Sequence, residues 1–115
     1  MSDARRTAVR PGRRGFLVPP VIPEDVDDPG VEKASGKVTL PHHVQWTIPG
    51  HVYDLGDRRD RVVVYELVLQ QGTARDVRYF IEVSTLIDLW DELYLPAHVR
   101  AAWTEWLSAR HGVRL

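Results

Sequence analysis

Three histidines stand close together in this chain and are the first candidates for chemistry: His42, His43 and His51. Neutral imidazole binds metal ions and moves protons near pH 7. A zinc site also needs further ligands at a recognisable spacing, from cysteine, histidine or carboxylate side chains. The chain has no cysteine, and no carboxylate accompanies these histidines at such a spacing. We therefore interpret them as loop histidines and predict no metal site.

The hydroxyl and carboxylate side chains show no catalytic pattern either. Thr73, Ser84 and Thr85 stand where helices are expected to begin, so capping accounts for them. The acidic residues are scattered, and the chain has neither a glycine-rich phosphate loop nor a nucleophile-elbow motif. We expect a protein that is not an enzyme and binds no cofactor.

Positive charge is concentrated at the N-terminus. Residues 1–15 hold five arginines and one aspartate, whereas residues 23–33 hold five acidic side chains and one lysine. Residues 36–115 hold nine basic and ten acidic side chains, so they lack the dense basic face of a duplex-DNA binder. A DNA-binding regulator remains the alternative function. It would use a degenerate helix-turn-helix at residues 60–81, with Arg75 and Arg78 joined by Arg5 and Arg6.

The spacing of apolar residues predicts helices in the C-terminal half. The first runs from residue 57 to 71, with Asp57 or Asp60 as its cap and Gly72 as a left-handed stop. The run 73–76 has the form of a capping box and opens a second helix. A β-hairpin across residues 70–72 is the competing interpretation, because residues 62–64 are β-branched and apolar residues alternate from 77 to 83.

Two further helices are expected after residue 83. Ser84 or Thr85 would cap the third, whose buried stripe is Leu86, Leu89, Trp90 and Leu93. Pro96 suits the first turn of the last helix. One face of that helix carries Val99, Trp103, Trp106 and Arg110, and Gly112 ends it. The tryptophan pair is expected in the core, in an exposed groove or in a homodimer face.

Residues 38–55 have the pattern of short strands. The runs 38–40, 43–48 and 51–55 alternate between apolar and polar residues or read as extended, and Pro49-Gly50 is a strong turn pair. We expect a small β-hairpin or an extended flap lying over the helices. The predicted fold class is thus mainly α, with α+β as the other option. The domain would hold three to four helices over residues 36–115.

Residues 1–35 are interpreted as an arm, disordered or ordered by a partner. The arm is basic, then apolar and proline-rich, then acidic. Prolines favour an extended backbone that presents its apolar side chains for docking. Docking on the same chain and docking on a partner are both open. The predicted anchors for a partner are Phe16, Leu17, Val18, Val21 and Ile22, together with Trp103 and Trp106.

Two absences bear on location. No run approaches the roughly 18 apolar residues that span a membrane. The lack of cysteine fits a reducing cytoplasm. We expect a cytoplasmic protein.

Three segments together resemble a group of small bacterial proteins encoded beside nucleotidyltransferase-type toxins. They are residues 40–46 (LPHHVQW), 65–79 (YELVLQQGTARDVRY) and 89–96 (LWDELYLP), and the similarity covers roughly residues 38–110. The resemblance implies an antitoxin, a non-catalytic protein whose extended N-terminal arm occludes its toxin and so neutralises that enzyme. It implies no site residue. The first functional hypothesis is therefore a protein–protein interaction or regulatory protein of the antitoxin kind.

Overall fold

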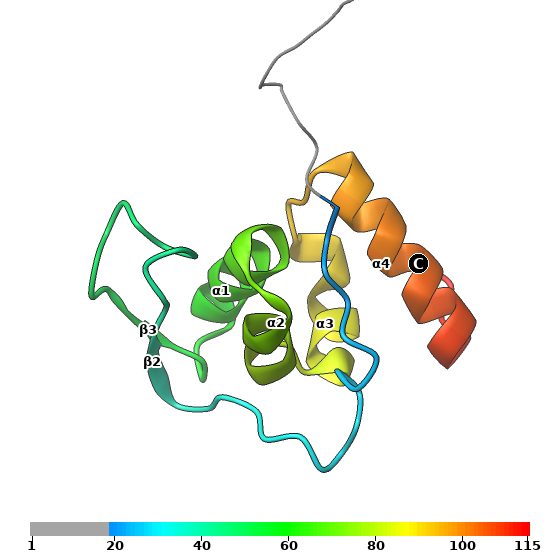
Figure 1. Ribbon diagram of the computed structural model, residues 1–115, viewed down its shortest axis with the longest axis horizontal. Coiled ribbons are helices and arrows are strands. Elements are labelled where there is room, and N and C mark those ends of the chain that lie inside the picture. The colour runs from blue at the N-terminus through cyan, green and yellow to red at the C-terminus, as the bar shows by residue number, and fades with distance from the viewer. Residues whose placement is uncertain (1–18) are drawn as a thin grey trace, which may run out of the picture.

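The computed structural model describes residues 19–115. Four α-helices follow a short two-stranded sheet, and the helices occupy most of the chain after residue 57 (Figure 1). The elements, in chain order, are β2 (Lys37–Thr39), β3 (Val52–Asp54), α1 (Arg58–Gln71), α2 (Ala74–Phe80), α3 (Val83–Leu89), the 3-10 turn η1 (Trp90–Glu92) and α4 (Ala97–His111). The predicted mainly helical fold with a short hairpin is confirmed.

Helix α1 begins and ends for different reasons. The carboxylate of Asp57 accepts a hydrogen bond from the Arg59 amide, which caps the first turn. The prediction of a left-handed stop at Gly72 is wrong, because its φ is −79°. Glycine is required there for space: a Cβ would lie 2.7 Å from the carbonyl oxygen of Val68. Close approach of the backbone therefore explains this glycine.

Helix α2 follows after a single turn, so the helical interpretation of residues 60–83 is confirmed and the hairpin is wrong. The predicted capping box is present. The Thr73 hydroxyl accepts from the Asp76 amide, and the Asp76 carboxylate accepts from the Thr73 amide. Val77 and Phe80 are buried.

Helix α3 begins earlier than predicted, because Glu82 caps it in place of Ser84 or Thr85. One Glu82 carboxylate oxygen accepts hydrogen bonds from the Thr85 amide and from the Ser84 and Thr85 hydroxyls. A glutamate has a long side chain and is an uncommon cap, so sequence preference pointed to the hydroxyl residues. The predicted buried stripe is confirmed through α3 and η1: Leu86, Leu89, Trp90 and Leu93 all lie in the core.

Helix α4 ends at the predicted glycine, Gly112, with φ of 66°. Val99, Trp103 and Leu107 are buried, and Trp106 packs against the core while remaining partly exposed. This helix lies apart from α1 and α2, with α3 between them in the view of Figure 1.

The two strands pair differently from the expected pattern. β2 and β3 are antiparallel, with Val38 opposite Tyr53. The strand predicted over residues 43–48 is wrong. Pro41 starts a tight turn there, in which its carbonyl oxygen accepts from the amides of both Val44 and Gln45. The turn at Pro49-Gly50 is as predicted, with Gly50 at φ of 78°.

The part of the arm that the structure describes, residues 19–35, lies along the helices between α3 and α4 and then passes below α2 in the view of Figure 1. Val26 is 0% exposed and belongs to the same core as the helices. The composition predicts a domain that starts at residue 36, whereas the core also includes Val26 of the acidic tract. The described half of the arm is docked on its own chain.

Gly72 provides a test of the α1–α2 junction. Gly72→Ala should lower the free energy of unfolding by about 1–3 kcal/mol, because the new methyl group collides with the Val68 carbonyl oxygen. Urea unfolding measures the change. The matched control is Gly30→Ala, whose Cβ would meet nothing closer than 3.4 Å and should cost no more than about 0.5 kcal/mol. Equal effects would contradict this account.

Candidate interaction surface

Lys33 fastens the described arm to the domain. Its ammonium donates hydrogen bonds to three carbonyl oxygens: Val26 at 2.7 Å, Arg78 at 2.6 Å and Ile81 at 2.7 Å. Burial lowers the pKa of Lys33 below its usual value, and the neighbouring Glu82 carboxylate offsets only part of this effect. Three acceptors match the three N–H bonds of the charged form. The charge also lies at the carboxyl end of α2, where the helix dipole favours a cation.

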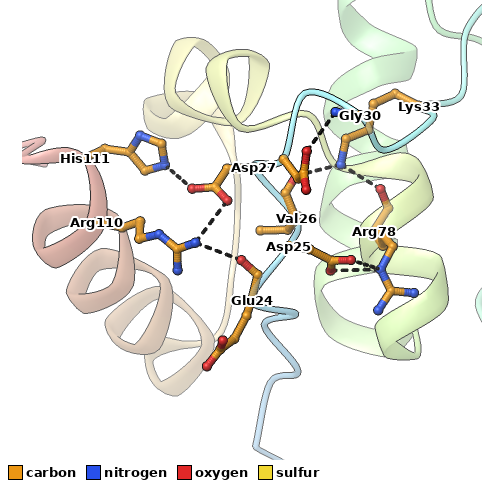
Figure 2. A network of polar contacts seen from close by, with 10 residues as sticks. Glu24, Asp25, Val26, Asp27, Gly30, Lys33, Arg78, Arg110 and His111 are labelled. Carbon is orange, nitrogen blue, oxygen red and sulfur yellow. Dashed lines mark hydrogen bonds and ion pairs between the residues drawn. The ribbon is translucent and has the colours of Figure 1, made fainter.

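Ion pairs flank this lysine on both sides (Figure 2). The Arg78 guanidinium donates to both carboxylate oxygens of Asp25, and this hydrogen bonding lowers the pKa of Asp25. Asp27 faces the other way and pairs with Arg110 and His111 of α4. The arm therefore bridges α2 and α4 with opposite sides of one acidic tract.

The predicted arm anchors divide into three groups. Phe16, Leu17 and Val18 lie outside the described residues, as do Arg5 and Arg6. Val21 is exposed, and Ile22 packs partly against the core. Within the described part of the chain, Val21 is the one arm anchor that is exposed, at 43% of its surface.

The two tryptophans predicted for partner binding have different environments. Trp103 is 0% exposed, so in this structure it is a core residue. Trp106 packs edge-to-face on it, with ring centroids 5.7 Å apart. The Arg110 guanidinium covers Trp106 at 5.3 Å from the ring centroid. Trp106 thus offers a partner only the part of its surface that the core and Arg110 leave uncovered.

The residues of the DNA-binding alternative are not equivalent either. Arg75 is exposed on α2. Arg78 is engaged with Asp25, so a phosphate would have to displace a carboxylate to reach it. Of the two predicted helix arginines, Arg75 is therefore the one that is exposed and has no carboxylate paired with it among the described residues.

His43 makes a contact that the sequence did not indicate. Its Nε2 lies 2.5 Å from an oxygen of Asp76, which also accepts from the amide and hydroxyl of Thr73. Such a pair could hold an imidazole as a general base. Here, however, Asp76 already serves as the capping residue of α2. Its hydrogen bonds, above all the one from His43, hold the pKa of Asp76 below its usual value despite the opposing effect of burial.

Among the described residues, no group of three or more histidine, cysteine or acidic side chains could hold a metal ion. His42 and His51 do not join His43 at Asp76. His51 instead stacks edge-to-face on Tyr53, with ring centroids 4.5 Å apart. His43 and His51 therefore have separate environments.

Residues 40–51, which connect β2 to β3, form the flap. Three contacts fix its conformation. Val44 is buried in the core, the side-chain amide of Gln45 donates to the Tyr53 hydroxyl, and His43 pairs with Asp76. Nevertheless, Trp46 is 64% exposed and Ile48 is 52% exposed, and Val52 at the start of β3 is 53% exposed. The alternating pattern predicted a strand for Trp46 and Ile48. The two prolines that bracket them were the signal for an independent loop.

A cleft of about 960 Å³ lies beside the flap. It is bounded by the end of β2, the first residues of the flap, α2 and the arm residues Val31 and Glu32. Apolar and charged side chains share its lining, including Phe80, Tyr79 and Arg75.

Comparison with protein-family models, curated proteins and solved structures finds no match to this chain. None of the helices in residues 19–115 has the length and apolar character needed to cross a membrane.

The clamp of the arm can be tested at Lys33. Lys33→Met keeps the length of the side chain but leaves three carbonyl oxygens without this donor, so the free energy of unfolding should fall by about 2–3 kcal/mol. The exposed Lys37→Met is the matched control and should change it by no more than about 0.5 kcal/mol. Urea unfolding of both variants decides; similar losses would show that the ammonium is not a clamp.

The lowered pKa of Asp76 predicts an acid-dependent contribution to stability. A carboxyl group whose folded pKa lies below its unfolded value, about 4, stabilises the fold above that value, and the contribution is lost as pH falls further. Asp76→Asn should therefore destabilise the protein at pH 7, and the difference from wild type should shrink below about pH 4. Asp91→Asn on the exposed surface is the control. Unfolding measured from pH 7 to pH 3 tests this, and a pH-independent difference would contradict it.

Proposed function

We propose that this chain is a non-catalytic protein that binds another protein through its flap and acts as an antitoxin in the cytoplasm. The observation that carries the proposal is the exposure of Trp46 on a loop whose conformation is already fixed. Solvent exposure of a large aromatic side chain brings no folding stability, whereas tryptophan is among the residues that contribute most to protein interfaces.

The fixed conformation of the flap supports binding for an entropic reason. A loop that must become ordered on association loses affinity in proportion to the freedom it gives up. Here the burial of Val44 and the bond from Gln45 to Tyr53 have met that cost during folding. Ile48 and Val52 lie on either side of the Pro49-Gly50 turn and extend the apolar surface.

The resemblance found in the sequence bears on the choice of partner. One of its three segments, residues 40–46, contains the start of the flap and ends at Trp46. The resemblance implies a nucleotidyltransferase-type toxin as the partner. The proposal accordingly assigns toxin recognition to the flap, with the exposed Val21 as a further contact from the arm.

The test is co-expression with a nucleotidyltransferase encoded beside this chain in the source genome. Wild-type protein should restore growth and co-purify with the enzyme, and the complex should survive high salt because apolar burial dominates it. The double variant Trp46→Ser and Ile48→Ser should weaken binding at least a hundredfold, as expected from the loss of two anchors worth about 2.8 kcal/mol or more together.

Tyr94→Ser is the matched control, because Tyr94 is 86% exposed and lies outside the flap. It should bind as wild type does. Growth inhibition that persists with the wild-type chain would refute the antitoxin role. Binding that the double variant retains would refute the flap as the interface. Co-purification of nucleic acid released by salt would instead favour the DNA-binding alternative.

A further inference from the structure

The outer edge of strand β2 is open for hydrogen bonding. The bond from the Leu55 amide to the Gly36 carbonyl oxygen sets the phase of the β2–β3 ladder. In an antiparallel pair, hydrogen-bonded and non-hydrogen-bonded positions alternate. Val38 therefore faces β3 with its backbone groups, whereas Lys37 and Thr39 direct their N–H and C=O groups away from it.

The equivalent edge of β3 confirms this phase and is covered. The Asp54 amide points away from β2 and donates to an Asp60 carboxylate oxygen of α1, at 2.8 Å. No such contact exists at β2: among residues 19–115, no loop or side-chain hydrogen bond uses the outward backbone groups of Lys37 or Thr39. Both residues are exposed. One edge of the sheet is thus closed and the other is free.

The free edge leads into the cleft. Thr39, Leu40 and Pro41 form one wall, and Arg75, Tyr79 and Phe80 of α2 lie across from them. The volume of about 960 Å³ is ample for a short extended peptide. Leu40 and Pro41, directly after β2, give one wall apolar side chains, and Tyr79 and Phe80 give the α2 wall aromatic ones.

The charges of the cleft select among peptides. The Asp76 carboxylate is engaged by His43 at 2.5 Å, and Arg78 is paired with Asp25. Arg75 is exposed, and no ion pair among the described residues engages it, so it provides the free positive charge on the α2 side. Glu32 stands at the arm side of the cleft. A strand with an acidic side chain toward α2 would complement this arrangement.

We propose that the cleft between β2 and α2 binds an extended, acidic peptide segment of a partner protein as a third strand on the open edge of β2. Main-chain hydrogen bonds to Lys37 and Thr39 provide the affinity, and Arg75 selects the acidic side chain. The surface is distinct from the exposed apolar side chains of the flap, so this inference goes beyond the proposed function.

The experiment selects a random dodecapeptide library, displayed on phage, against the full-length chain. Enriched peptides should alternate β-branched or aromatic residues with others and carry an acidic residue at a constant position. Their affinity is then measured by isothermal titration for three variants. Thr39→Pro removes an outward N–H without touching the ladder to β3, a change that edge strands tolerate. It should weaken binding at least tenfold.

Arg75→Glu should weaken binding of the acidic peptides at least tenfold, and selection against this variant should enrich basic peptides instead. Trp46→Ser, in the flap, should leave affinity unchanged. A peptide methylated on alternate backbone nitrogens tests the strand geometry on the unaltered protein, and one of its two registers should fail to bind. This peptide measurement does not depend on whether the Thr39→Pro variant folds.

Three results would overturn the inference. They are the absence of any enriched peptide, full affinity of both N-methylated registers, and peptides whose binding depends on Trp46 and ignores Arg75. The last result would support the flap and reject the cleft. Failure of toxin neutralisation, in contrast, would leave peptide binding at β2 untouched, so the two proposals fail separately.

Discussion

One ammonium group sets how the N-terminal side of this protein is built. The three carbonyl oxygens around Lys33 come from the arm, from the last turn of α2 and from the residue that follows it. Two of them end a helix, where carbonyl groups lack intrahelical partners. A single cation therefore closes the end of α2 and holds the arm against it. Val26, which supplies the third carbonyl, is drawn into the core by the same contact.

The ion pairs around this lysine act in a different way. The pair of Asp25 with Arg78 lies at the surface, where ion pairs contribute little net stability. The Asp27 side chain is more buried, but its partners Arg110 and His111 are partly exposed. These ion pairs instead determine the direction in which the arm runs. Because Asp25 faces α2 and Asp27 faces α4, only one path of the arm satisfies both (Figure 2). Burial and the lysine supply the stability, and the surface charges select the course of the chain between the two helices.

How much the sequence could predict depended on the range of each interaction. The capping box at Thr73 and Asp76, the stripe from Leu86 to Leu93 and the stop at Gly112 are local, and their patterns predicted them correctly. The contacts of Lys33 could not be predicted from a local pattern, because its acceptors on Arg78 and Ile81 are 45 and 48 residues away. His43 and Asp76 are 33 residues apart for the same reason. Alternation misled where Pro41 forced a turn in place of a strand.

The position of His43 links the two surfaces of the molecule. It belongs to the flap, it lines the cleft, and its partner Asp76 caps α2. The flap is therefore attached to the same helix turn that carries Arg75 across from β2. A ligand in the cleft that disturbed the pair of His43 with Asp76 would loosen the flap, and a partner that stabilised the flap would strengthen the wall of the cleft. Any such coupling must be equal in both directions, because both effects draw on the free energy of one contact.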